Sequence, residues 1–280
     1  DIDGGEYVSG LVGSNGGLVR DVTVSGVING SRNVGGVAGE SDSTGRVRES
    51  TAAVTVTGSK NVGGLVGSQA VGATVEESRA TGSVTGWKNV GGLVGKQSRN
   101  TATATSTATA TVDGSISVGG LVGTNIGPGS TVRTSSAGGE INGSRSVGGL
   151  VGSNSETVTR SYATARVNGS ESVGGLVGQN RFDDAAVTRS YAAGRVTGAT
   201  LTGGLVGERV GSGASASGYW DTNATGQDTS GGGTPLSTAE MTGAAARDNM
   251  TALAFPAEWQ TRAGDYPGLD WQVNDVPTPE

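Results

Sequence analysis

The chain has 280 residues, of which 53 are glycine, while 33% are apolar and 4% aromatic, so a single globular core would lack large side chains. The net charge of −6 argues against nucleic acid and anionic membranes as partners, because both attract basic surfaces. Cysteine and histidine are absent, which excludes disulfides and removes the commonest general base and transition-metal ligand.

A five-residue motif, GG(L/V)(V/A)G, recurs at intervals of 26 to 29 residues after a degenerate first copy, SGLVG, at Ser9. Self-similarity at this period indicates a protein built from stacked repeats. The structural repeat residues are the paired glycines and one leucine: Gly35, Gly36, Gly63, Gly64, Gly91, Gly92, Leu93, Gly119, Gly120, Gly148, Gly149, Gly174, Gly175, Gly203 and Gly204.

Between the motifs, small or β-branched residues occupy every second position, as at Ala80, Gly82 and Val84. Such alternation is the period of a strand, and turns such as Asn29-Gly30-Ser31 separate the strands. No unit can bury its apolar residues alone, so the units should stack in register. The sequence therefore predicts an all-β, right-handed parallel β-helix (β-solenoid) of about eight coils over residues 1–218, with glycine allowing sharp corners.

Residues 101–112 replace this pattern with strict Thr/Ala alternation. A flat array of threonine hydroxyls can order water, which makes ice binding an alternative function. We do not expect the array to continue, because the positions taken as equivalent elsewhere are Arg79, Thr164, Arg166 and Arg195.

The period is lost around residues 211–218, after which aromatic residues become concentrated. Met241, Met250 and a run of alanines predict one short helix near 237–253. We expect residues 219–275 to form a mixed cap over the open end of the solenoid, which would otherwise be a bare strand edge. Residues 276–280 resemble the start of a linker or tail.

The units with Ser161-Tyr162-Ala163 and Ser190-Tyr191-Ala192, each followed by Gly-Gly-Leu-Val-Gly, resemble the GLUG repeat. The tail from Tyr219-Trp220-Asp221-Thr222 resembles what often follows such repeats. This family occurs in bacterial and archaeal surface proteins, including filamentous-haemagglutinin-like adhesins. The resemblance implies an extracellular solenoid at the cell surface, and it implies no catalytic residue because the family has no agreed activity.

The sequence Asp221-x-Asn223-x-Thr225-Gly226 resembles the front half of a calcium loop, but Gly232 stands where the twelfth-position acid belongs. Asp221, Asn223 and Thr225 are therefore weak calcium candidates, and a solvated turn is the alternative. Asp183-Asp184 and the pair Asp1 and Asp3 are weaker still, and we expect no other cofactor. The stretch 91–96 fails the spacing of a Walker phosphate loop, because Val90 stands where the first glycine belongs. The stretch 211–216 matches a dinucleotide-binding fingerprint in its residue letters but has no helix pattern after it and no βαβ unit around it.

Some parallel β-helices are polysaccharide lyases or hydrolases, whose acids cluster on neighbouring coils. Here the outward acids are scattered over different positions of the repeat. Glu49 and Glu77 do occupy the same position in successive units, but Arg48 and Arg79 lie near them in the sequence. A surface charge ladder is the simpler interpretation, so we predict no enzyme and no catalytic residues. The dispersed acids are Glu49, Glu76, Glu77, Glu140, Glu156 and Glu171.

Five Asn-x-Ser/Thr sequons, at Asn29, Asn142, Asn168, Asn223 and Asn249, are glycan acceptors in a secreted protein or else plain turns. Taken together, these features predict an extracellular module that serves a cell-surface protein as rigid spacer and adhesive surface. Its partners would be other surface proteins, glycans or further copies of itself, without membrane insertion. A filament subunit stacked end to end and a glycan-active enzyme are the alternatives.

Overall fold

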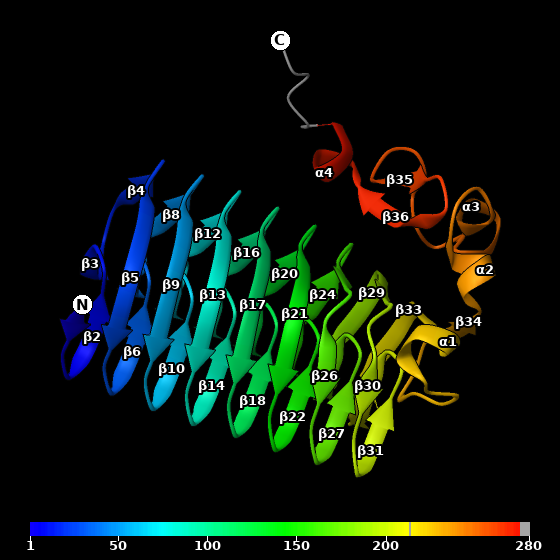
Figure 1. The fold of residues 1–280 in the computed structure, drawn as a ribbon, viewed down its shortest axis with the longest axis horizontal. Coiled ribbons are helices and arrows are strands. Elements are labelled where there is room, and N and C mark those ends of the chain that lie inside the picture. Colours follow the sequence, from blue (N-terminus) through cyan, green and yellow to red (C-terminus); the bar gives the residue numbers. More distant parts are fainter. Residues whose placement is uncertain (213, 275–280) are drawn as a thin grey trace.

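The computed structural model describes residues 1–212 and 214–274, so the predicted tail at 276–280 lies outside the described residues. The chain winds into eight coils of a parallel β-solenoid, each passing through three sheets in turn (Figure 1). The predicted all-β solenoid is confirmed, and its handedness remains a prediction. None of the described helices is long and apolar enough to cross a membrane.

Sheet 1 is the widest, and it includes a short and a long strand from most coils. Its strands are β1 (Ile2–Asp3), β4 (Leu18–Arg20), β5 (Thr23–Asn29), β8 (Arg46–Arg48), β9 (Thr51–Thr57), β12 (Thr74–Glu76), β13 (Arg79–Thr85), β16 (Ala102–Ala104), β17 (Thr107–Asp113), β20 (Thr131–Arg133), β21 (Ser136–Asn142), β24 (Thr157–Thr159), β25 (Tyr162–Ala163), β26 (Arg166–Asn168), β29 (Ala186–Ala192), β30 (Val196–Thr197), β33 (Ser215–Asp221) and β34 (Thr234–Leu236).

Sheets 2 and 3 flank the GG(L/V)(V/A)G motif, which forms the bend between them. Sheet 2 contains β2 (Glu6–Ser9), β6 (Arg32–Gly35), β10 (Lys60–Gly63), β14 (Lys88–Gly91), β18 (Ile116–Gly119), β22 (Arg145–Gly148), β27 (Glu171–Gly174) and β31 (Thr200–Gly203). Sheet 3 contains β3 (Val12–Asn15), β7 (Ala38–Ser41), β11 (Val66–Gln69), β15 (Val94–Gln97), β19 (Val122–Asn125), β23 (Val151–Asn154), β28 (Val177–Arg181) and β32 (Val206–Val210).

Equivalent residues of successive coils lie directly over one another, as the repeat predicted. Val62 pairs with Val90, and Gly63 with Gly91. The stacked valines and leucines are fully buried, including Leu65 and Leu93 at 0% exposure. A thin apolar core therefore runs the length of the solenoid, with strand pairing from coil to coil contributing the backbone hydrogen bonds.

The paired glycines are required by close approach between coils rather than by an unusual φ angle. A methyl group on Gly64 would lie 2.2 Å from the carbonyl oxygen of Gly92. The left-handed conformation falls instead on non-glycine residues, such as Asn61 and Asn89, both with φ 56°. The expectation that glycine supplies the corner conformation is wrong in this respect, because asparagine tolerates that region of φ/ψ space.

Buried amides and hydroxyls form ladders that the sequence analysis did not predict. The Asn89 amide donates to Asn61 Oδ1 at 2.7 Å, and Asn61 donates in the same way to Asn33. At the corner of sheet 1 the backbone N–H of Ser50 donates to the Ser78 hydroxyl at 3.2 Å in the next coil. These ladders satisfy polar groups that would otherwise be buried without partners.

Residues 220–236 close the C-terminal end of the solenoid. Strand β33 crosses the domain boundary predicted at residue 218, and its Trp220 is 4% exposed and covers Gly204. The Ser230 hydroxyl accepts the backbone N–H of Val206 at 2.9 Å, on the last coil. The free edge of β32 is thereby partly occupied, whereas residues 237–274 of the predicted cap (219–275) lie along the side of the coils and not over their end.

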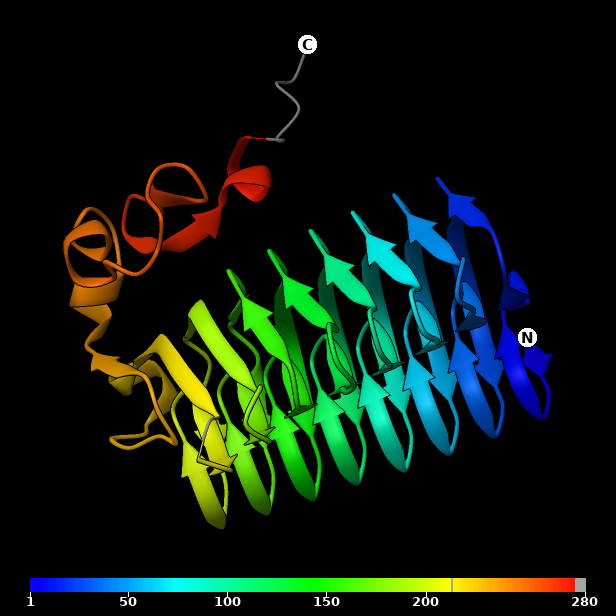
Figure 2. The same ribbon diagram turned by 180° about the vertical axis from the view of Figure 1, so that it is seen from behind.

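Residues 237–274, which we call the C-terminal arm, fold back along the side of the coils (Figures 1 and 2). After α1 (Thr222–Thr225), the arm contains α2 (Thr238–Met241), α3 (Ala245–Asn249), an antiparallel hairpin of β35 (Trp259–Arg262) and β36 (Asp265–Leu269), and α4 (Asp270–Asn274). The single helix predicted near 237–253 is two short ones, because Gly243 takes a left-handed φ of 61° between them.

Candidate functional site

An outward row of sheet 1 determines where the arm rests on the solenoid. In register, this row runs Arg79, Thr107, Ser136, Tyr162 and Tyr191. The two tyrosine rings stack, with centroids 5.1 Å apart and planes inclined by 6°. The aromatic side chains of this row therefore end at Tyr162, and the next coil towards the N-terminus presents a serine.

The arm packs on this tyrosine pair through aromatic and aliphatic side chains. Trp259 is fully buried, with its ring centroid 5.5 Å from that of Tyr191. The Tyr191 hydroxyl donates to the Pro267 carbonyl at 2.6 Å, and the Tyr266 hydroxyl donates to Asp221 Oδ2 at 2.6 Å. These contacts make a second, smaller core between arm and solenoid.

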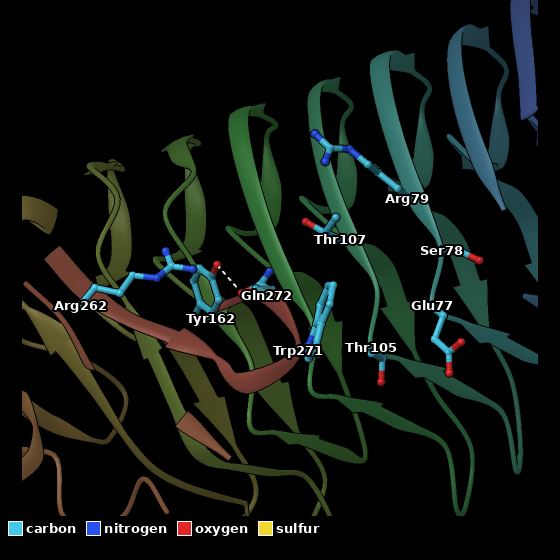
Figure 3. A pocket seen from close by; sticks show the side chains of 9 residues that line it. All are labelled: Glu77, Ser78, Arg79, Thr105, Thr107, Tyr162, Arg262, Trp271 and Gln272. Carbon is cyan, nitrogen blue, oxygen red and sulfur yellow. Dashed lines mark hydrogen bonds between the residues drawn. The ribbon is translucent and has the colours of Figure 1, made fainter. Parts of the chain in front are cut away.

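An open cleft of about 790 Å³ lies where the arm passes over the small residues of that row (Figure 3). Its walls come from three coils of the solenoid, from the end of strand β35 and from helix α4. The lining residues are Glu77, Ser78, Arg79, Thr105, Thr107, Tyr162, Arg262, Trp271 and Gln272.

Hydrogen bonds hold the arm's side chains in place within the cleft. The Trp271 indole N–H donates to the Thr134 carbonyl at 3.1 Å, which anchors the ring. Gln272 accepts from the Tyr162 hydroxyl at 2.8 Å and donates to Ser136 Oγ at 2.9 Å. Trp271 also lines a second cavity of about 260 Å³. The indole thus stands in a fixed orientation beside two hollows.

Two arginines reach the cleft without an acidic partner. Within the described residues, neither Arg79 nor Arg262 has a carboxylate oxygen within 4.0 Å of its guanidinium. Glu77, by contrast, is paired with Arg48 at 2.9 Å. Figure 3 shows the guanidinium group of Arg262 beside Tyr162 and that of Arg79 beside Thr107. The cleft therefore combines aromatic faces, hydrogen-bonding groups and unpaired positive charge.

The predicted surface charge ladder is present beside this cleft. Arg20 pairs with Glu49 at 2.7 Å, and Arg48 bridges Glu49 and Glu77. The hydrogen bond from Arg20 lowers the pKa of Glu49, with attraction to the same guanidinium adding to the effect.

The remaining acids considered as catalytic candidates are dispersed. Glu76 pairs with Arg133 and Glu171 with Arg145, while Glu140 is exposed. Burial raises the pKa of Glu156, which accepts a hydrogen bond from the backbone of Gly129. These four acids do not pair with one another, and two of them are bound to arginines.

The calcium candidates have structural roles in the C-terminal closure. Asp221 is fully buried, with Oδ1 capping α1 through Ala224 N at 2.9 Å. Thr225 donates to the Asp221 carbonyl, and Asn223 Oδ1 accepts from the backbone of Thr238. The Asp221 carboxylate is thus already engaged by two donors. Among the described residues no group of three acidic, cysteine or histidine side chains could hold a metal ion.

The weaker candidates lie on turns or in the stack. Asp183 and Asp184 are exposed between β28 and β29, and Asp3 accepts a hydrogen bond from Asn29. The stretch 91–96 belongs to the bend between β14 and β15, and residue 213 of the other glycine-rich stretch lies outside the described residues.

Three sequon asparagines use their amide nitrogens in stacked hydrogen bonds. Asn168 donates to Asn142 at 2.9 Å, Asn142 to Asp113 at 3.0 Å, and Asn29 to Asp3 at 2.8 Å. Asn249 donates to a helix carbonyl, and Asn223 is exposed. A glycan on the first three would displace a hydrogen bond of the stack, which favours the turn interpretation there.

The row of outward hydroxyl side chains extends over more coils than the positions taken as equivalent in the sequence predicted. Strand pairing aligns Thr55, Ser83 and Thr111 on three successive strands of sheet 1. The row then continues into Glu140 and Arg166, so the hydroxyl surface ends after these coils. Of the positions taken as equivalent in the sequence, Thr164, Arg166 and Arg195 lie on later coils, and Arg79 lies on β13 but in a different row, paired with Thr107.

From the sequence, the aromatic residues of the tail are predicted to form a cap, and no pattern links Trp271, Gln272 or Arg262 to a site. Their placement depends on the arm folding back across coils more than 100 residues earlier in the chain, as the Tyr162–Gln272 hydrogen bond illustrates. The only available signal was the concentration of tryptophan and tyrosine after residue 218.

Comparison with known proteins identifies the repeat. The GLUG motif matches residues 58–85, 143–168 and 169–197. No curated protein and no solved structure matches the chain. The matched units have the same strand order and stacking register as the coils between and around them. The chain is a GLUG-repeat protein that folds as a structural β-solenoid module.

Proposed function

We propose that this module works outside the cell, as a stiff spacer and adhesive surface of a cell-surface protein. The observation that carries the proposal is the uninterrupted register of the coils, from β2 to β31 in sheet 2 and from β3 to β32 in sheet 3. Parallel strand pairing and the buried ladders resist bending of the rod, while every coil presents one further row of outward side chains. A spacer that carries a binding surface needs both properties.

The composition supports the same proposal. An acidic chain without cysteine or histidine suits a binding surface better than a hydrolytic centre, because the commonest general base is missing. The acids that would be needed for glycan cleavage are mostly bound to arginines. We therefore favour binding over catalysis for this module.

Assembly by end-to-end stacking is less well supported. Such a filament needs a free strand edge at each end of the solenoid. At the C-terminal end the backbone of the last coil already bonds to Thr229 and Ser230, and Trp220 fills the interior. These residues would have to move before another copy could dock there.

Surface location is tested on intact cells of the source organism. Antibodies against this module should label unpermeabilised cells, and external protease should remove the labelling while a cytoplasmic marker survives. Small-angle scattering of the purified module should give the profile of a monomeric rod. Labelling only after permeabilisation would refute the extracellular role, and concentration-dependent fibres would favour the filament.

A further inference from the structure

We propose that the cleft beneath the C-terminal arm binds an acidic oligosaccharide. The inference deepens the adhesive role proposed above and rests on it, by assigning a site and a ligand class. The site is made by Arg79, Thr107 and Tyr162 of the solenoid together with Arg262, Trp271 and Gln272 of the arm (Figure 3).

The aromatic groups suit the apolar face of a sugar ring. One face of Tyr162 is covered by Tyr191, its row continues on the other side into the small residue Ser136, and Tyr162 lines the cleft together with Trp271. The Trp271 indole N–H is used in its bond to Thr134, so the ring acts as a flat surface rather than as a donor. The C–H groups of a pyranose, weakly positive, pack favourably on the electron-rich face of such rings.

The two arginines indicate that the sugar carries a carboxylate. Arg79 comes from strand β13 and Arg262 from strand β35, so cations approach the cleft from both solenoid and arm. Guanidinium groups bind carboxylates through paired, charge-assisted hydrogen bonds. A carboxylate on the ligand would pair with a guanidinium group that has no acidic partner, whereas a neutral sugar would leave both guanidinium groups unpaired.

The remaining polar groups match hydroxyls. Thr107 Oγ1 and Ser136 Oγ lie 3.0 Å apart, and Gln272 connects Ser136 to the Tyr162 hydroxyl. This chain of donors and acceptors is already ordered in the free protein. Pre-organised groups reduce the ordering cost of binding, which matters for a weakly held ligand such as a saccharide.

The size of the site points to a short oligomer. A volume of about 790 Å³ in an open cleft accommodates more than one sugar ring. A peptide with acidic side chains would satisfy the arginines but would make little use of a flat indole and tyrosine. The acidic peptide is therefore the competing ligand that the experiment must separate from the sugar.

Binding is measured by calorimetry on the full 280-residue chain. The acidic probes are tetragalacturonate, a hyaluronan tetrasaccharide and sialyllactose. Their neutral comparators are fully methyl-esterified tetragalacturonate and lactose, and tetraglutamate is the peptide comparator. We expect at least one acidic sugar to bind with a Kd of about 1 mM or tighter, and its comparators to bind at least about tenfold more weakly.

Variants then locate the site. Arg79→Gln changes an exposed solenoid residue and should weaken binding about tenfold without altering the fold. Trp271→Ala should do the same and should remove any ligand-induced change in tryptophan fluorescence that the wild type shows. Lys60→Gln, an exposed cation on sheet 2, is the matched control and should leave the affinity unchanged. Near-ultraviolet circular dichroism verifies that the arm stays docked in each variant.

The proposal is overturned if none of the acidic sugars binds with a Kd of about 1 mM or tighter. It is equally overturned if the methyl ester or tetraglutamate binds as well as the acid, or if Arg79→Gln binds like the wild type. None of these results bears on surface labelling of cells, so failure of the site and failure of the extracellular role are distinguishable.

Discussion

The short distance between neighbouring coils determines which residue types are tolerated at many positions of this protein. The glycine pairs are the clearest case, because the space that a methyl group would occupy already contains backbone atoms of the next coil. Backbone cannot yield as a flexible side chain can, so each substitution there forces two coils apart.

Gly64→Ala should destabilise the solenoid by about 3 kcal/mol or more, since its methyl group would meet the Gly92 carbonyl at 2.2 Å. Gly138→Ala is the matched control, because its nearest neighbour, Thr164 Oγ1, would be 3.5 Å away. That change should shift stability by less than about 1 kcal/mol. Urea unfolding followed by circular dichroism measures both, and equal stability of the two variants would contradict the close-approach argument.

Asn89→Asp should cost about 3 kcal/mol at neutral pH, because it buries a carboxylate opposite Asn61 Oδ1 and removes the donor of their 2.7 Å bond. The penalty should shrink in acid, as the new carboxyl takes up a proton. Asn100→Asp also lies at a left-handed position but is exposed, and it should be nearly neutral. If chemical denaturation gave both variants the same midpoint, the ladder would not contribute to stability.

At the scale of elements, the solenoid and the arm differ in how they are held. Coils are joined by strand pairing that repeats along the molecule, whereas the arm depends on one aromatic cluster, a few side-chain hydrogen bonds and the ion pairs of Glu258 with Arg160 and Arg189. The arm is therefore the element most readily released, and its release would dismantle the cleft.

Alkaline pH should release the arm. Burial raises the pKa of the Tyr191 hydroxyl, and burial with the hydrogen bond to Asp221 raises that of Tyr266. A raised folded-state pKa means that this stabilisation is complete below the unfolded value of about 10 and is lost as the pH rises towards the folded value. Tryptophan fluorescence during urea unfolding, at about pH 9 and about pH 11, measures the loss.

Tyr191→Phe should make that pH dependence shallower, because one titrating proton is removed. Tyr7→Phe is the control, since Tyr7 is 44% exposed at the other end of the molecule. An unchanged slope in Tyr191→Phe would show that another group controls the transition.

At the scale of the whole molecule, the coils behave as interchangeable units in one register. Deleting residues 63–90 joins Val62 to Gly91 and removes one complete coil, since Gly63 and Gly91 occupy equivalent positions. We expect a folded solenoid shorter by about 4.8 Å. Small-angle scattering measures the length, and circular dichroism the strand content.

Deleting residues 63–89 instead is the control for register. It leaves one extra residue inside a strand, which must bulge or turn its side chains to the opposite face. This variant should be much less stable to urea than the complete-coil deletion. Similar stabilities would mean that register along the stack is not required.

The sequence by itself determined the solenoid, its number of coils and its buried Val and Leu positions, because stacking requires the same side chain at the same offset in every unit. It also located the charged ladder, for the same reason of shared offset. The buried Asn and Ser ladders were accessible in principle, since they too repeat, but a polar residue next to glycine looks like a turn until its neighbours are placed.

Only the tertiary structure decided that Trp271 and Gln272 lie across the coil of Ser136, over 130 residues away in the chain. The arm does not repeat, so no periodicity constrains where it packs, and its docking depends on the surface that Tyr162 and Tyr191 present. Repetition allowed the rod to be predicted from local pattern, whereas the cleft arises from long-range contacts between a non-repeating and a repeating part of the chain.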